Sequence, residues 1–195
     1  GMPGSRLRGG NLELAWLIPL SLIGTVCGWL YFVSEHASEA LAHAIGERPV
    51  VKAMLAGLAL AICGTVLPYT MFAGETQADV LMETYLTIPA GVLIATGLVK
   101  AMLTPALINM GWRGGHFFPV IFSGVSLGYG LAILTGADPV FCVAVCTAST
   151  MGAVMRQPVM VVGLLLMCFP LKGIVCMIIA AVIAAGIPLP KSLRK

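Results

Sequence analysis

Long apolar runs, separated by short polar or proline-containing segments, fill the chain from residue 12 to residue 187. The first run, 12–33, holds about 22 residues, which as a helix is long enough to cross a hydrocarbon layer about 30 Å thick. Further apolar helices are predicted over residues 50–67, 88–110, 117–134, 140–155, 159–169 and 173–187. The pattern therefore predicts an all-α membrane protein that passes through the bilayer several times.

Polar and proline breaks interrupt these helices inside apolar territory. Asp138 and Pro139 predict a helix start, because Asp is a good N-cap and Pro suits the first helical position. Further breaks are predicted at 156–158 and 170–172, so that the run 159–169, about 11 residues, is too short to span the bilayer alone. Non-helical backbone at membrane depth is tolerated where it is buried in protein or lines a polar cavity. A bundle of tilted, broken helices is thus predicted, as is typical of ion transporters.

Two polar stretches carry titratable side chains at helical spacing. The first, 34–49, contains Glu35, His36, Glu39, His43 and Glu47. Its two histidines suggest a metal site, but on an amphipathic helix they more often form a solvated or interfacial face, which is the interpretation we favour. The second stretch has one acidic residue every four positions: Glu75, Asp79 and Glu83. Inside a membrane such a stripe marks an ion or proton path, whereas at an aqueous surface it is only solvated, and the surface interpretation is favoured.

Composition supports the membrane assignment. Of the 195 residues, 59% are hydrophobic and 10% are charged, which does not describe a soluble core within a polar surface. The formal net charge of +3 is not gathered into a basic stripe, so nucleic acid is excluded as a partner. Basic residues flank the apolar part of the chain and favour a cytoplasmic C-terminus: Arg6, Arg8, Lys191, Arg194 and Lys195.

The cysteines and histidines form no catalytic or metal-binding motif. All six cysteines lie in apolar runs, where Cys behaves as a small hydrophobe, and no disulfide framework is implied. Cys142 and Cys146 share a helix face, but without His or carboxylate partners packing is favoured over a metal site. The sequence contains no HExxH motif and no Ser/His/Asp arrangement. We therefore predict a protein that is not an enzyme, without catalytic residues, metal or organic cofactor.

The strongest functional signal is Gly114-Gly115-His116-Phe117-Phe118-Pro119, where the helix from about residue 117 begins. Glycines let backbone approach a ligand closely, and the first N–H groups of a helix lack intrahelical partners and carry the positive end of its dipole. The motif can therefore bind an anion through main-chain amides. The alternative is that the two glycines merely end one helix and start another. His116 could titrate near neutral pH, but a hydrogen-bonded structural role is the favoured interpretation.

This motif resembles the G-G-x-F-x-P motif in the second half of the CLC chloride channels and chloride/proton antiporters. The surroundings are also similar, because the family has a basic residue and a threonine at positions matching Lys100 and Thr104, a glycine matching Gly111, and a break like 156–158. The resemblance covers about residues 12–187. It implies the second half of the CLC inverted-repeat fold, with a homodimer contact within 140–187. It also implies a chloride ion bound at Gly115, His116, Phe117 and Phe118.

The chain departs from the family pattern at three points. The first-half motifs G-S-G-I-P and G-K-E-G-P, with the gating glutamate, do not occur, and no tyrosine follows Tyr129 to match the one that contacts the central ion. The position of His116 is usually apolar in the family. We therefore expect a single transmembrane domain over 1–195, the C-terminal half of a longer, truncated transporter whose first half is its missing partner.

The expected function is transmembrane chloride transport in the cell membrane, as a channel or as a chloride/proton antiporter subunit. Chloride, the lipid bilayer, a second copy of the chain and the missing N-terminal half are the expected partners. Lys100 would add positive potential from a distance. The alternative is a non-transporting membrane assembly or regulatory protein that dimerises through its small-residue helices. The glycines Gly124, Gly128 and Gly130 form a small-residue face that allows close helix packing.

Overall fold

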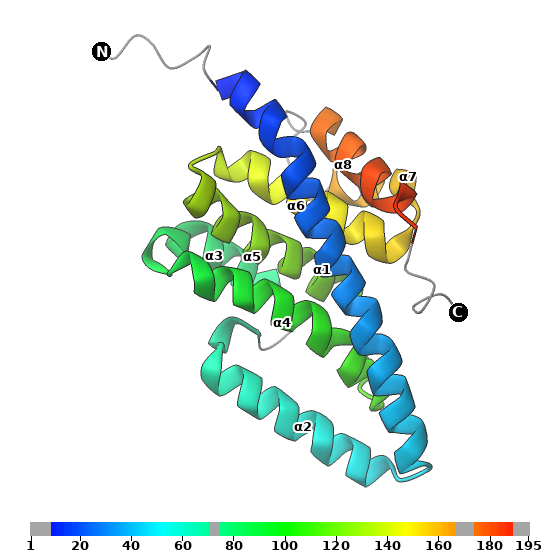
Figure 1. Ribbon diagram of the computed structural model, residues 1–195. Coiled ribbons are helices and arrows are strands. Elements are labelled where there is room, and N and C mark those ends of the chain that lie inside the picture. The colour runs from blue at the N-terminus through cyan, green and yellow to red at the C-terminus, as the bar shows by residue number, and fades with distance from the viewer. Residues whose placement is uncertain (1–8, 71–74, 167–173, 189–195) are drawn as a thin grey trace.

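The computed structural model describes residues 9–70, 75–166 and 174–188, and within these ranges the chain is built of helices without a strand. In chain order the elements are α1 (Gly9–Ile45), α2 (Pro49–Val66), the 3-10 turn η1 (Pro68–Thr70), α3 (Glu75–Thr84), the 3-10 turn η2 (Tyr85–Thr87), α4 (Ala90–Asn109), α5 (Phe117–Thr135), α6 (Pro139–Met155), α7 (Pro158–Leu165) and α8 (Ile174–Gly186). Figure 1 shows α1 crossing the stacked helices α4, α5 and α6. The predicted all-α fold is confirmed.

The first helix is longer than the predicted span. The apolar run 12–33 and the polar stretch after it form one helix of 37 residues, which ends where Gly46 takes a φ of 71°. The helix continues because the residues between Ser34 and Ile45 include no proline or glycine, and alanine, leucine and glutamate among them are good helix formers. At 1.5 Å per residue α1 is about 55 Å long, well beyond the thickness of a bilayer.

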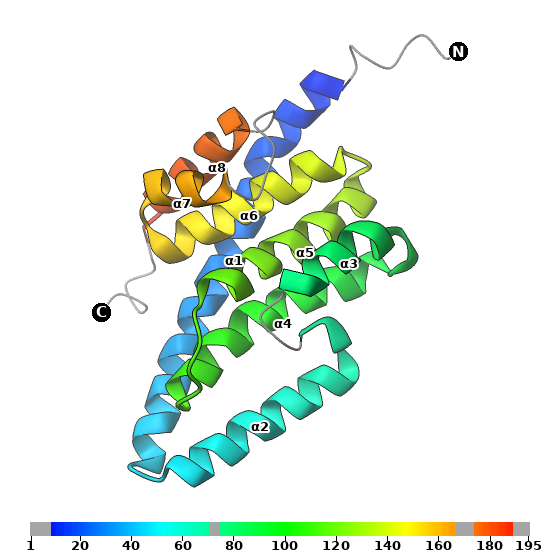
Figure 2. The same cartoon turned by 180° about the vertical axis from the view of Figure 1, so that it is seen from behind.

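Helix α2 agrees with the predicted run 50–67 and begins with Pro49 in its first turn. Ala56 is its one buried residue, and most of its large apolar side chains are exposed. Figures 1 and 2 show α2 set apart from the other helices, along the side of α4 that faces away from α5. Its length and apolar surface suit contact with lipid.

Helix α3 covers the predicted acidic stripe. Glu83 is exposed, in agreement with the surface interpretation, whereas the side chains of Glu75 and Asp79 lie outside the described residues. The opposite face is held against α5, because Leu81 is fully buried and Tyr85 stacks on Tyr129, with ring centroids 4.5 Å apart. α3 is therefore a short helix packed on the bundle.

Small residues and hydroxyls join α4 to α5. A Cβ placed on Gly97 would lie 2.7 Å from the carbonyl oxygen of Ser123, so glycine is required for this approach. The Ser123 hydroxyl donates to the Gly97 carbonyl at 2.6 Å, and the Ser126 hydroxyl donates to the Leu93 carbonyl at 2.8 Å. Hydroxyl donors of this kind link helices where the surroundings are apolar.

The small-residue face of α5 also packs inside the chain. A Cβ on Gly124 would lie 2.5 Å from Thr147 Cα, and one on Gly128 would lie 2.5 Å from Val143 Cα, both on α6. Gly130 approaches α4 in the same way. Close helix packing through these glycines is confirmed. α4 and α6 cover this face, and dimerisation through other small-residue helices stays a prediction.

Helix α6 lies at the centre of the fold. It starts as predicted, with Pro139 first and with the Asp138 carboxylate accepting from the next two amides, and every residue from 142 to 153 is buried. It ends at Arg156, whose φ of 54° is left-handed. The following helix, α7, has 8 residues and is shorter than the predicted run 159–169. The predicted break at 170–172 lies outside the described residues.

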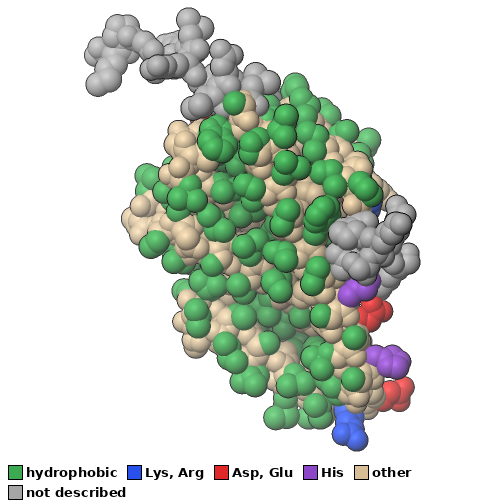
Figure 3. Space-filling view, viewed as in Figure 1, with side chains coloured by type: hydrophobic (Ala, Val, Ile, Leu, Met, Phe, Trp, Pro, Cys, Tyr) green, Lys and Arg blue, Asp and Glu red, His purple; other side chains and the backbone are tan. Residues whose placement is uncertain are grey.

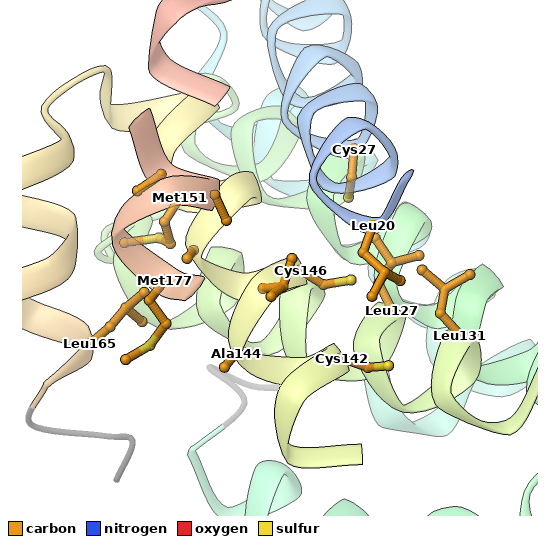
Figure 4. Close-up of a cluster of buried hydrophobic side chains, with 14 of the residues drawn as sticks. Leu20, Cys27, Leu127, Leu131, Cys142, Ala144, Cys146, Met151, Leu165 and Met177 are labelled. Carbon is orange, nitrogen blue, oxygen red and sulfur yellow. The ribbon is translucent and has the colours of Figure 1, made fainter. Parts of the chain in front are cut away.

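The main core forms where α1, α5, α7 and α8 meet α6. Figure 4 shows these side chains converging: Leu20, Cys27, Leu127, Leu131, Cys142, Ala144, Cys146, Met151, Leu165 and Met177. Cys27, Cys142 and Cys146 are fully buried in this core, which confirms that these cysteines serve packing. Cys168 lies outside the described residues.

The surface is that of a membrane protein. Apolar side chains cover the face in Figure 3, while charged and histidine side chains gather along one edge, where Figure 1 places the C-terminal end of α1. Four helices are long and apolar enough to cross a membrane: α1 within Ala15–Ile45, α2, α4 and α5. The protein is a multi-pass integral membrane protein. The basic residues that flank the chain, from Arg6 and Arg8 to Lys191, Arg194 and Lys195, lie outside the described residues.

Candidate functional site

A glycine turn closes the C-terminus of α4. The N–H groups of Gly111 and Trp112 donate to the carbonyls of Ile108, at 3.0 Å, and Leu107, at 3.1 Å. This pair of bonds makes a Schellman motif, in which Gly111 has a φ of 96°. A side chain with a Cβ would be strained in this conformation. The motif determines the direction in which the loop 112–116 leaves α4.

The N-terminus of α5 has open amides. Within the part of the chain that the structure describes, no N–H group from Arg113 to Phe118 donates to a backbone carbonyl, and the last four of these belong to Gly115, His116, Phe117 and Phe118. The first backbone bond at this end runs from the Val120 N–H to the His116 carbonyl, at 3.2 Å, and no side chain caps the helix. Helical N–H groups point towards the N-terminus, so these donors face the loop.

The N-terminus of α6 is different. There Oδ1 of Asp138 accepts from the N–H groups of Val140, at 2.7 Å, and Phe141, at 3.1 Å. A built-in carboxylate thus occupies the position that an anion would take at a helix N-terminus. In α5 no residue of the described chain supplies such a group. Of these two neighbouring helices, α5 is the one that leaves its donors free for an external anion.

A cavity of about 250 Å³ lies between α2, α4 and the loop. It is lined by Leu60 of α2, by Lys100, Leu103, Thr104, Leu107 and Ile108 of α4, and by Trp112, Arg113, Gly114, Gly115 and Pro119. The structure therefore brings Lys100 and Thr104 together with the double glycine. Among the described residues, the lining contains two cations and no acidic side chain.

Neither packing nor backbone strain accounts for Gly114 and Gly115. A Cβ placed on either would meet no atom within 4 Å, and neither has a positive φ. This contrasts with Gly111, where φ is left-handed, and with Gly124 and Gly128, where a helix backbone lies in the way. Because both glycines line the cavity, any side chain there would extend into space that the protein leaves empty.

Lys100 is buried at the inner wall of the cavity, with 4% of its surface exposed. Its Nζ donates to the Thr70 carbonyl at 2.6 Å and lies 5.9 Å from the centre of the Phe122 ring. The Thr104 hydroxyl donates to the Lys100 carbonyl at 2.8 Å. The ammonium of Lys100 is buried, and low-dielectric surroundings screen the field of a buried charge less than water does.

The four predicted site residues have different surroundings. Gly115 lines the cavity, whereas the side chains of the next three residues do not. The His116 ring stacks on the Phe117 ring at 4.7 Å, Phe117 is half-buried against the main core, and Phe118 is 50% exposed. The favoured hydrogen-bonded role of His116 stays a prediction, because the contact that the structure shows for this ring is the stack on Phe117. These three residues could reach an anion through their amides alone.

The sequence analysis gave no role to six residues of the cavity lining: Leu60, Leu103, Leu107, Ile108, Trp112 and Arg113. Arg113 and Trp112 come from the loop, and Leu60 comes from α2. Arg113 carries a usable signal, since it is a cation directly before the double glycine. No sequence signal distinguishes Leu60 from the other leucines of its apolar helix. Only the tertiary arrangement brings it to the loop.

The other candidate sites form no metal centre. Among the described residues, no three His, Cys, Asp or Glu side chains lie close enough together to hold a metal ion. His36 Nδ1 lies 3.0 Å from the Phe32 carbonyl one turn earlier, and His43 is exposed. This arrangement agrees with a solvated or interfacial face on α1.

Comparisons with known proteins point to one family. A family model described as "Voltage gated chloride channel" matches residues 9–188, which is nearly the whole chain. No curated protein and no solved structure shows a significant match.

Proposed function

The chain belongs to the voltage-gated chloride channel family, and from that premise we propose that it moves chloride past a site built from the first amides of α5. Chloride transport by a multi-pass membrane protein follows from the family and from the four helices long enough to cross a bilayer. The observation that supports the site is the row of N–H groups without backbone acceptors, from Gly115 to Phe118, beside the cavity.

Amide donors suit a permeating halide. A chloride ion that leaves water loses hydrogen bonds, and charge-assisted bonds from N–H groups replace them. Four donors at the positive end of a helix dipole offer this replacement without a directly bound cation, which would hold the ion too tightly for transport. Lys100 and Arg113 add positive potential from the cavity wall.

The double glycine gives the anion room. Because a Cβ at Gly114 or Gly115 would meet no protein atom, a side chain at either position would compete with a bound ion and leave packing unaffected. A simple junction between two helices needs one residue to end α4, and Gly111 already has that role. The interpretation in which the two glycines only join helices therefore leaves them unexplained.

We also propose that the chain is the second half of an inverted-repeat transporter, whose first half completes the ion path. This rests on the resemblance and on the absence of the first-half motifs from the 195 residues. A homodimer contact within 140–187 would use α7 and α8, because α6 is buried. Val159 of α7 is 86% exposed and Val175 of α8 is 63% exposed. Val159 also lines an apolar groove between the two helices, together with Ile178 and Val182 of α8.

Flux from liposomes tests the function and the site together. Vesicles containing the protein, joined to its first half where one precedes it, are loaded with chloride, and efflux is followed with a chloride electrode. We expect Gly115→Leu to abolish efflux, while Gly57→Leu, a matched change on the exposed helix α2, leaves it intact. Efflux that is equal in both variants would remove the site assignment.

The same vesicles separate the two modes of transport. Proton movement against a pH gradient, driven by a chloride gradient, would show an antiporter. Chloride efflux that leaves the internal pH unchanged would show a channel.

A further inference from the structure

The polar half of α1 is more than the bilayer requires. A helix needs about 20 residues to cross a membrane, and α1 has 37. The extra length, from about Ser34 to Ile45, runs past the end of α4, as Figures 1 and 2 show. The function proposed above uses no residue from this part of the chain.

Two interactions join the extension to the last residue of α4. The side-chain amide of Asn109, Nδ2, donates to the Glu35 carbonyl at 3.0 Å and to the Ser38 hydroxyl oxygen at 2.8 Å. The Ser38 hydroxyl in turn donates to the Glu35 carbonyl at 3.1 Å, and Ser38 is 6% exposed. These three groups form a closed hydrogen-bond network between α1 and α4, which we call the Asn109 tether.

A small apolar cluster surrounds the tether. Ala42 of α1, Ala56 of α2 and Met110, which follows Asn109, are buried together, and Leu107 and Ile45 pack against them. Leu107 also lines the cavity, and its carbonyl accepts the N–H of Trp112 in the Schellman motif. The end of α4 is thus fixed from one side by hydrogen bonds and from the other by packing.

The position of the tether determines what it controls. Asn109 is the last helical residue, and two residues later Gly111 turns the chain into the loop that carries Gly114 and Gly115. A small rotation of the α4 end is carried through the loop to the amides of α5. Because hydrogen-bond strength falls steeply with misalignment, such a shift weakens the binding of an anion by these amides.

We propose that Asn109 is a positioning residue, which through Ser38 and Glu35 holds the loop 111–116 where its amides can bind chloride. The proposal rests on the chloride site described above. In this proposal the extension of α1 holds the ion site in position. Asn109 itself does not line the cavity, so it acts through the loop and not by contact with the ion.

Asn109→Leu and Ser38→Ala test the tether. Leucine is similar in size to asparagine, is neutral and donates no hydrogen bond. Ser38→Ala is the milder change, and it tests the same network if Asn109→Leu does not fold. Ser34→Ala is the matched control, because the Ser34 hydroxyl donates to the Met102 carbonyl at 2.6 Å and so joins the same two helices, away from the loop.

Two measurements are made on each protein. Isothermal titration with chloride gives the affinity, and hydrogen–deuterium exchange gives the protection of the amides from Gly111 to Phe118. One hydrogen bond contributes on the order of 1 kcal/mol, so we expect the chloride dissociation constant to rise roughly fivefold in Asn109→Leu and Ser38→Ala. Exchange in the loop should become faster in both variants. Ser34→Ala should match the wild type in affinity and in loop exchange, although it loses a similar amount of stability.

The outcomes separate this proposal from the function on which it rests. Unchanged chloride affinity in Asn109→Leu, with measurable binding by the wild type, overturns the tether and leaves the chloride site standing. An equal loss of affinity in Ser34→Ala also overturns it, since general loosening of α1 from α4 then explains the effect. No binding by the wild type overturns the chloride site, and loop exchange alone then decides whether Asn109 holds the loop.

Discussion

Adding one methyl group at Gly128 should destabilise the fold measurably. The Cβ of Gly128→Ala would lie 2.5 Å from Val143 Cα and 2.8 Å from Val143 N. Both are backbone atoms in the buried part of α6 and cannot rotate away. Non-bonded carbon atoms prefer separations of about 3.5–4.0 Å, so α5 and α6 would have to move about 1–1.5 Å apart at this point.

The magnitude follows from two opposing effects. Overpacking of a tight interior typically costs about 1–3 kcal/mol, and separation of the helices also weakens dispersion contacts along α5 and α6. Alanine favours the helix over glycine by about 1 kcal/mol, which offsets part of the loss. We therefore expect Gly128→Ala to lower the free energy of unfolding by about 1–2 kcal/mol, and Gly128→Val to lower it further.

Unfolding in mixed micelles, titrated with SDS and followed by far-UV circular dichroism, measures this change. Gly57→Ala is the control, because it lies inside α2 and its Cβ would meet nothing within 4 Å. The control should be neutral or slightly stabilising, by up to about 1 kcal/mol. If Gly128→Ala were as stable as Gly57→Ala, the close approach of α5 to α6 through this glycine would be refuted.

Three further predictions concern the helix ends and the cavity. Asp138→Ala should lower the free energy of unfolding by about 1 kcal/mol, because two amides of α6 lose their acceptor. Asp138→Asn should retain most of the wild-type stability, because Asn is also a good N-cap. An Asp138→Ala variant as stable as the wild type in the SDS titration would contradict the cap. Gly111→Ala should cost about 1–2 kcal/mol through strain at a φ of 96°, whereas Gly114→Ala should cost little, and equal stabilities would argue against the Schellman turn. Arg113→Gln should reduce chloride flux several-fold in about 0.01 M salt and have little effect near 1 M, because the Debye length falls from about 30 Å to about 3 Å. Arg113→Lys should behave as the wild type, and a Gln variant with the same loss at every salt concentration would show that Arg113 acts by contact and not by its field.

The sequence predicted the helices where local rules decide. Asp138 followed by Pro139 marks the start of α6 because capping depends on neighbouring residues alone, and the apolar runs located α2, α4, α5 and α8 to within a few residues. The end of α1 was missed, because a polar stretch of good helix formers does not show whether it continues the preceding helix. The length of α7 was overestimated for a similar reason, since its apolar run extends past the helix end at Leu165.

For the candidate site, the sequence by itself identified the amide donors and the helix that precedes them. A double glycine before a helix start is a local pattern, and so are a lysine within an apolar run and a threonine four residues later. It did not show that the glycines of α5 face α6. Nor did it show that Leu60 and Arg113 share a cavity with Lys100, or that Asn109 bonds to the polar half of α1. Helix formation, capping and left-handed turns depend on interactions within a few residues, so they can be predicted from the local sequence. Which helix faces meet depends on contacts between residues far apart in the chain, and these exist only once the helices have packed.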